Sequence, residues 1–158
     1  MSDEKKFTES EWHKTMAKEL YNKTWELLEK KDRTPEEEES MVHMSHASRF
    51  HWSMIGEPIN FYRGEWQLAR VYTVLGRAVS ALHHAKLCLK YMEDHSIGDF
   101  DRAYAYEAMA RASAAAGEHE EFEKYFKLAK DAGEKIEKKE DQDWFLKDLD
   151  SGPWFGMK

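Results

Sequence analysis

Two stretches of the chain share one pattern, Ala69-Arg70-Val71-Tyr72-Thr73-Val74-Leu75-Gly76-Arg77 and Ala110-Arg111-Ala112-Ser113-Ala114-Ala115-Ala116-Gly117-Glu118. In each, an Ala-Arg pair is followed by helix-forming residues, then by a glycine, and then by a second helix-forming run. Gly76 and Gly117 are 41 residues apart, and the same offset relates Arg70 to Arg111. A fixed period in this range is typical of stacked helical hairpins. Such stacks usually present extended binding surfaces, so the pattern favours a binding protein over an enzyme.

The spacing of apolar residues outside these stretches also has the helical period. It predicts six or seven helices in a single domain, 1–158, at about 9–31, 35–55, 58–75, 79–94, 99–116, 117–136 and 139–149. Thr8 with Glu11, and Thr34 before Pro35, are typical helix starts. We therefore expect a divergent first hairpin at 9–55, hairpins at 58–94 and 99–136, a capping helix at 139–149, and a tail at 150–158.

The charge of the chain argues against several classes of partner. It contains 31 acidic and 24 basic residues, for a net charge of −7. Nucleic-acid binding needs a basic face, and a membrane-surface helix needs Lys and Arg on its polar side. No apolar run approaches the roughly 18 residues of a transmembrane helix, and the start of the chain is charged. We expect a cytoplasmic protein that binds neither nucleic acid nor membrane.

The residues around the two glycines resemble the packing positions of the tetratricopeptide-repeat (TPR) superfamily, including small bacterial members. They are Leu68, Ala69 and Tyr72 before Gly76, Ala81, Ala85 and Cys88 after it, Met109 and Ala110 before Gly117, and Phe122, Phe126 and Ala129 after it. The likeness covers 60–136. Glu65 replaces the first aromatic of the family pattern, and the period exceeds the usual value of about 34 residues. The resemblance implies an all-α, right-handed superhelical array of antiparallel hairpins, with no cofactor.

The resemblance also implies a concave groove lined by the first helix of each hairpin. Its lining would include Arg63, Trp66, Arg70, Tyr104, Glu107 and Arg111. Two guanidinium groups in a groove can hold a carboxylate or a phosphate, which is the role expected of Arg70 and Arg111. Trp66 and Tyr104 would hold apolar side chains.

A structural role for the two arginines is the alternative. Each arginine would then pair with a nearby acid, such as Glu65 or Glu107, and join neighbouring helices.

Histidines supply a second candidate site. The chain has eight, and His43 and His46 have the i, i+3 spacing that places two metal ligands on one face of a helix. His83 or His84 from the fourth helix could meet them, with Glu107 as a further ligand. The alternative is that these histidines bind no metal and are ordinary core or surface residues.

No catalytic constellation stands out. Cys88 is at a packing position, and no glycine-rich phosphate loop or strained nucleophile turn is present. The aromatic tail, with Trp154 and Phe155, could cover the last apolar face or could dock into a second molecule to make a homodimer. We predict a non-enzymatic adaptor that binds a peptide or protein segment. The alternatives are a small His-rich metal- or ligand-binding protein and a self-assembling structural subunit.

Overall fold

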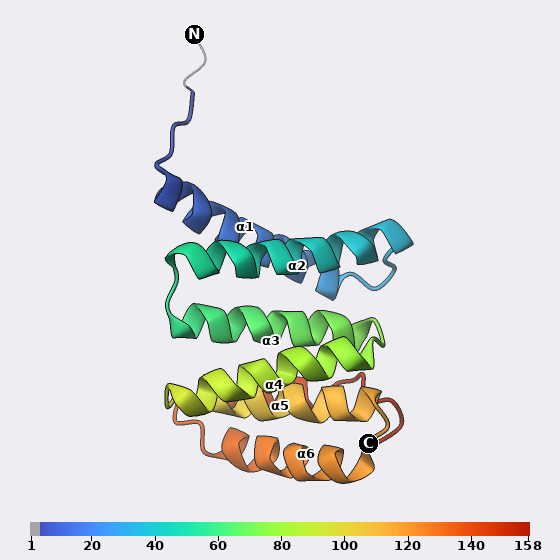
Figure 1. The fold of residues 1–158 in the computed structure, drawn as a ribbon. Coiled ribbons are helices and arrows are strands. Elements are labelled where there is room, and N and C mark those ends of the chain that lie inside the picture. The colour runs from blue at the N-terminus through green and yellow to red at the C-terminus, as the bar shows by residue number, and fades with distance from the viewer. Residues whose placement is uncertain (1–3) are drawn as a thin grey trace.

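The computed structural model describes residues 4–158, and seven α-helices account for most of them (Figure 1). They are α1 (Glu9–Glu29), α2 (Pro35–Ile55), α3 (Pro58–Val74), α4 (Ala78–Asp94), α5 (Phe100–Ala115), α6 (His119–Glu134) and α7 (Lys139–Asp150). Within the described range there is no strand. The predicted all-α stack of neighbouring helices is confirmed, whereas a right-handed superhelical twist stays a prediction.

Local sequence signals set the helix starts as predicted. The Thr8 hydroxyl accepts a hydrogen bond from the Glu11 backbone N–H, and the Glu11 carboxylate accepts one from the Thr8 N–H in return. Thr34 and Glu37 make the same reciprocal pair before Pro35. Each capping box satisfies two backbone donors that the first turn of a helix would leave without partners.

The two repeated glycines end α3 and α5 in the same way. Gly76 and Gly117 both have φ of +72°, a conformation that favours glycine. After α3, the N–H of Arg77 donates to Tyr72 O and the N–H of Gly76 donates to Thr73 O, both at 2.9 Å. The equivalent pair of bonds closes α5. This is the Schellman arrangement, which explains why the pattern repeats around glycine.

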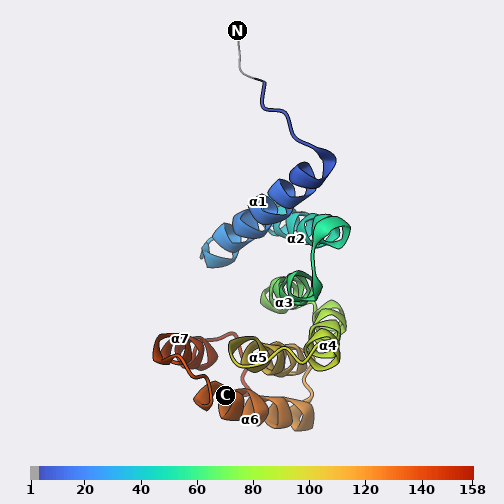
Figure 2. The ribbon, with the colours of Figure 1, turned by 90° about the vertical axis from the view of Figure 1, so that its left-hand side faces the viewer.

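The helices form two layers. The most extensive contacts join α1 to α2, α3 to α4 and α5 to α6, so these are three hairpins. In the other direction α1 contacts α3, α3 contacts α5, and α5 contacts α7. Figure 2 shows α2 and α4 on one side of the stack, while α1 and α7 lie on the opposite side. We call the side formed by α1, α3, α5 and α7 the odd-helix face.

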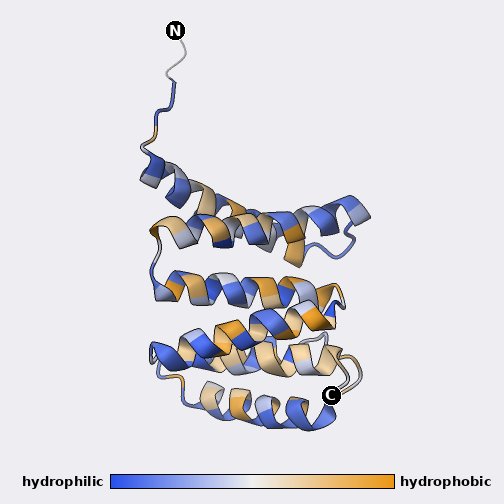
Figure 3. Ribbon diagram, in the orientation of Figure 1, coloured by the Kyte–Doolittle hydropathy of each residue, from blue (hydrophilic) through white to orange (hydrophobic). Residues whose placement is uncertain are grey.

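The centre of the molecule is α5, which contacts α3, α4, α6 and α7. Its buried residues lie all around the helix, and six of them are alanines. Small side chains let four neighbours approach one helix closely. Along the other helices, hydrophobic and hydrophilic residues are interspersed (Figure 3). None of the helices in residues 4–158 is both long and apolar enough to cross a membrane.

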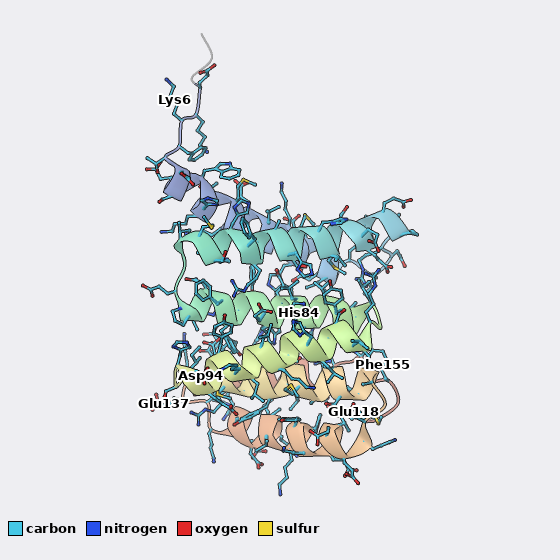
Figure 4. All side chains as sticks on the ribbon, viewed as in Figure 1. Lys6, His84, Asp94, Glu118, Glu137 and Phe155 are labelled. Atoms are coloured by element: carbon cyan, nitrogen blue, oxygen red, sulfur yellow. The ribbon has the colours of Figure 1, made fainter. Side chains whose placement is uncertain are left out.

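The tail folds back on the stack, as the capping interpretation predicts. Trp154 is buried and packs against Phe122 and Phe126 of α6, with ring centroids 5.7 and 5.2 Å away. Its indole N–H donates to Leu149 O at the end of α7. Phe155, the next residue of the tail, remains 45% exposed (labelled in Figure 4). The tail thus covers the apolar rings of α6.

Candidate functional site

A cavity of about 430 Å³ opens on the odd-helix face, and all four odd-numbered helices contribute to its wall. We call it the aromatic pocket, because seven of its fourteen lining residues are aromatic. The lining comprises Tyr21, Trp25, Glu29, Tyr62, Arg63, Trp66, Arg70, Phe100, Asp101, Tyr104, Trp144, Lys147, Asp148 and Ser151. Its volume falls in the range of ordinary ligand sites, which run from about 300 to 1,000 Å³.

The wall repeats at the same 41-residue offset as the glycines. Trp25, Trp66, Glu107 and Asp148 are successive members of one series, one from each odd-numbered helix. Three of them line the aromatic pocket, and Glu107 lies directly beneath. A second series contributes Tyr21, Tyr62 and Trp144. One helical position therefore faces the same cavity along the whole stack.

The rings of the pocket pack against one another, two pairs tilted and one edge to face. The Trp25 and Trp66 centroids are 5.5 Å apart, and Tyr104 meets Trp66 at 5.4 Å with the planes at 83°. Phe100 lies 4.8 Å from Tyr104. Separations of this size are those of favourable aromatic pairs. The pocket therefore presents fixed aromatic surfaces to whatever enters it.

Beneath these rings, buried charges join three helices. Arg70 on α3 donates to Glu107 on α5 at 3.0 Å and to Asp148 on α7 at 2.9 Å. Trp66 Nε1 donates to the other oxygen of Glu107 at 3.2 Å, and Tyr104 donates to Asp148 at 3.1 Å. Burial by itself would raise the pKa of Asp148, but Arg70, Arg111 and the Tyr104 hydrogen bond together outweigh it, and the pKa lies below its usual value. Asp148 is thus held in its ionised form beside Arg70.

Arg111 does not face the pocket, which corrects the predicted cationic pair. It is 1% exposed, and its Nε lies 2.6 Å from Glu107. Its remaining donors reach the backbone oxygens of Asp148 and Ser151, at 2.8 and 3.0 Å, while its guanidinium stacks 4.2 Å over the ring of Trp154. The end of α7 and the tail cover Arg111, so it ties those segments to α5.

The other predicted groove residues differ in whether they line the aromatic pocket. Arg63, Trp66, Arg70 and Tyr104 do line the aromatic pocket, whereas Glu107 is 1% exposed and lies under it. The ion pairs of Arg70 and Arg111 with Glu107 are those of the alternative structural interpretation. Glu65, the other acid considered for them, pairs instead with Arg49 at 2.9 Å.

The charges around the pocket balance. Arg63, Arg70 and Lys147 line it, opposite Glu29, Asp101 and Asp148. Arg63 pairs with Asp101 at 3.2 Å, and Arg70 is already engaged. Glu29 and Lys147, on opposite rims, have no ion pair among the described residues. A pocket that carries no net charge, and whose arginines are already paired with acids, suits an uncharged, apolar or aromatic group.

A second cavity, of about 370 Å³, adjoins the first. Its lining is Trp25, Leu28, Glu29, Lys30, Lys31, Arg33, Arg70, Val74, Gly152 and Pro153. Trp25, Glu29 and Arg70 belong to both cavities. We call it the basic pocket, because four of its residues are cationic and only Glu29 is acidic.

Two of the histidines, His46 on α2 and His84 on α4, come together away from these cavities. The rings of His46 and His84 lie 5.5 Å apart, so a helix-4 histidine does meet His46 as the metal hypothesis requires (Figure 4 labels His84). However, His46 Nε2 shares a hydrogen bond with the Tyr72 hydroxyl at 2.7 Å. His84 Nδ1 donates to Glu65 at 2.7 Å, in place of the predicted Glu107. Burial, and then the charge of His84, lower the pKa of His46.

A three-ligand metal centre is not assembled there. In the range 4–158, no three His, Cys, Asp or Glu side chains come together in a way that could hold a metal ion. His43 and His83 are exposed. The thiol of Cys88 is fully buried, and burial raises its pKa well above the usual value, so it is poorly placed to act as a nucleophile.

Residues of α1 and α7 also line the site, although they were not among the predicted groove residues. Tyr21 and Trp25 from α1, and Trp144 and Asp148 from α7, all line the aromatic pocket. The signal was present, because each is a whole number of 41-residue offsets from Tyr62 or Trp66.

Comparison with known proteins adds no relative: no family model, no curated protein and no solved structure matches the chain. Membership of the TPR superfamily stays a prediction.

Proposed function

We propose that this protein is a non-enzymatic adaptor that binds an extended peptide or protein segment along its odd-helix face. In this proposal a bulky apolar side chain of the partner enters the aromatic pocket. The observation that carries the proposal is the make-up of that pocket, in which aromatic rings from four helices surround a cavity without net charge. Binding energy at protein interfaces concentrates where such rings surround a desolvated anchor.

The pocket's polar chemistry supports binding rather than catalysis. Its buried acids and arginines already satisfy one another, as the bonds of Arg70 to Glu107 and Asp148 illustrate. A general acid or base needs a titratable atom that is free to contact the substrate, and a pKa near the working pH. The sequence predicted that Arg70 and Arg111 would bind an anionic group of the partner. In this proposal they hold the wall of the pocket together instead, and the aromatic rings contact the partner.

Neither alternative function has comparable support. A metal-binding role lacks a group of three ligands within the described residues. Self-assembly would draw on exposed apolar side chains such as Trp12, Phe50 and Met54, which are 46%, 61% and 52% exposed. These lie on α1 and α2, outside both cavities. Light scattering of the purified protein distinguishes a monomeric adaptor from a self-assembling subunit.

A peptide screen tests the proposal directly. Immobilised protein would be used to select from a random phage-displayed peptide library, and selected peptides would be measured in solution by fluorescence polarisation. We expect enrichment of peptides that contain Trp, Phe, Tyr or Leu, with affinity reduced about tenfold or more by Trp144→Ala.

Trp12→Ala is the matched control for that screen. Both tryptophans are exposed, at 67% for Trp144 and 46% for Trp12, so neither substitution should unfold the chain. Only Trp144 lines the aromatic pocket. Failure to enrich any peptide, or equal loss of affinity in both variants, would contradict the proposal.

A further inference from the structure

The two cavities on the odd-helix face differ sharply in charge. The aromatic pocket has three cationic and three acidic residues in its lining, whereas the basic pocket has four cationic residues and one acidic residue. This contrast occurs in a chain whose net charge is −7. A local excess of positive charge on an acidic protein indicates which part of a partner would be drawn to it.

Part of the positive charge in the basic pocket is not neutralised within the protein. Lys30 is paired with Glu37 at 2.6 Å, and Arg70 is held by the buried network. Lys31 is exposed and has no ion pair among the described residues. Arg33 is paired with Glu38 at 3.9 Å, its side chain is only 12% exposed, and its buried Nε has no hydrogen-bond partner among the described residues.

Arg33 is also held in place. Its Nη1 donates to the backbone oxygens of Leu27, Leu28 and Lys30, at 3.2, 3.5 and 2.9 Å, and so closes the C-terminal end of α1. A guanidinium fixed in this way loses little conformational entropy when an anion approaches it. The exposed Lys31 and the largely buried Arg33 therefore place positive charge at one end of the paired cavities.

The distance between the two pockets follows from α3. Trp66 lines only the aromatic pocket, and Val74 lines only the basic pocket. Eight residues of helix separate them, which corresponds to about 12 Å at 1.5 Å per residue. An extended peptide covers about 3.3 Å per residue, so three or four residues span this distance.

We propose that the bound segment carries an aromatic residue and, three or four positions away, an aspartate or glutamate whose carboxylate lies in the basic pocket beside Lys31 and Arg33. This inference rests on the proposed adaptor function and specifies its partner. The aromatic ring supplies the anchor, and the carboxylate fixes the register and the direction of the segment. Trp25, Glu29 and Arg70 form the passage between the two sites because they line both cavities.

Synthetic peptides with acetylated N-termini and amidated C-termini test the inference, since blocked ends leave the side-chain carboxylate as the only acid. Each peptide would contain one Trp and one Glu, separated by one, three, four or seven positions in either order. We expect the tightest binding at three or four positions and in one order only. Replacing that Glu by Gln should weaken binding about three- to tenfold.

A charge reversal locates the carboxylate. Lys31→Glu should weaken the Glu peptide but leave the Gln peptide unchanged, and Lys86→Glu, at an exposed position of α4 outside both cavities, should affect neither. Equal affinity of Glu and Gln peptides at every spacing would overturn the inference and leave the adaptor proposal standing. The inference would also be overturned if a Gln peptide with a free C-terminus bound more tightly than the amidated Glu peptide, because the basic pocket would then take a terminal carboxylate. If no Trp-containing peptide binds at all, the proposed function itself fails.

Discussion

Trp66 and Glu107 are separated by the repeat offset of 41 residues, and their side chains meet in a hydrogen bond of 3.2 Å between Nε1 and Oε2. They occupy the same position on α3 and α5, two helices in contact. The repeat therefore places a donor above an acceptor at the base of the aromatic pocket. Glu107 uses its second oxygen for Arg70 and Arg111, at 3.0 and 2.6 Å. One carboxylate thus joins the ring that faces the pocket to the arginines that hold its wall.

Replacing Glu107 with Gln should destabilise the fold strongly. The amide keeps the shape of the side chain but removes the charge that compensates two buried guanidinium groups. Loss of one partner from a buried ion pair costs about 3–5 kcal/mol. Urea denaturation followed by circular dichroism would show a lower midpoint. Glu120→Gln, at an exposed position of α6, is the control and should shift the free energy of unfolding by no more than about 0.5 kcal/mol. Equal midpoints for the two variants would mean that Glu107 is not the centre of the network.

The attachment of α7 depends on a close approach at Gly133. A methyl group added there would overlap the ring of Phe145, which is fully buried and has no space to move into. We expect Gly133→Ala to lower the free energy of unfolding by about 1–3 kcal/mol. It should also weaken peptide binding, because α7 carries Trp144 and Lys147.

Gly98→Ala is the matched control for Gly133→Ala. A methyl group at Gly98 would meet nothing within 4 Å. The stability of this variant should therefore stay near that of the wild type, in thermal unfolding monitored by circular dichroism. A similar fall in stability for both variants would show that the cost at Gly133 is not steric.

Acid pH should loosen the contact of α1 with α2 through a histidine pair. His13 and His51 share a hydrogen bond of 2.8 Å between their Nδ1 atoms, so they cannot both be protonated in that arrangement. Burial, and then the neighbouring His13, lower the pKa of His51. The one carboxylate in ion-pair range of His13, Glu9, is 3.8 Å away. Because the unfolded chain binds more protons than the folded chain below the usual histidine pKa of 6.5, stability should fall as pH falls through that value.

A comparison of variants isolates this effect. The free energy of unfolding of the wild type should decrease between pH 7 and pH 5, with each linked proton contributing at most about 1.4 kcal/mol per pH unit. His51→Gln should make the dependence shallower but not abolish it, because the pKa of His46 is lowered as well. His119→Gln, at an exposed position of α6, should leave the wild-type dependence in place. An unchanged slope in His51→Gln would rule out the pair as a source of acid sensitivity.

Features set by local chemistry could be predicted from the sequence. Gly76 and Gly117 were readable because a left-handed helix end requires glycine whatever lies around it. The capping threonines Thr8 and Thr34 have the same local character. The first hairpin was harder to relate to the others, since Pro35 stands 41 residues before Gly76 and hides the repeat. The offset nevertheless continues from Trp66 back to Trp25.

The role of Arg111 could not be predicted in this way. The repeat predicts that Arg111 on α5 lies beside Arg70 on the neighbouring α3. The exposure of Arg111, however, depends on residues far along the chain. Asp148, Ser151 and Trp154 cover it, and only the folded path of α7 and the tail brings them there. The aromatic pocket was half predicted for a related reason. The glycine pattern identified residues of α3 and α5, whereas those of α1 and α7 share the 41-residue offset but lie outside the stretch 60–136 that carries that pattern.

Substitutions in the tail test whether the chain folds back over α5 and α6 after α7. Trp154 is 6% exposed, packs on Phe122 and Phe126, and stacks over the guanidinium of Arg111. Trp154→Ala should lower the free energy of unfolding by about 3–5 kcal/mol. Phe155→Ala, one residue later at a position that is 45% exposed, should change it by no more than about 0.5 kcal/mol. Chemical denaturation of both variants measures the difference. If the two substitutions cost the same, Trp154 does not cover α6 in solution, and Arg111 would then be open to solvent at the end of the stack.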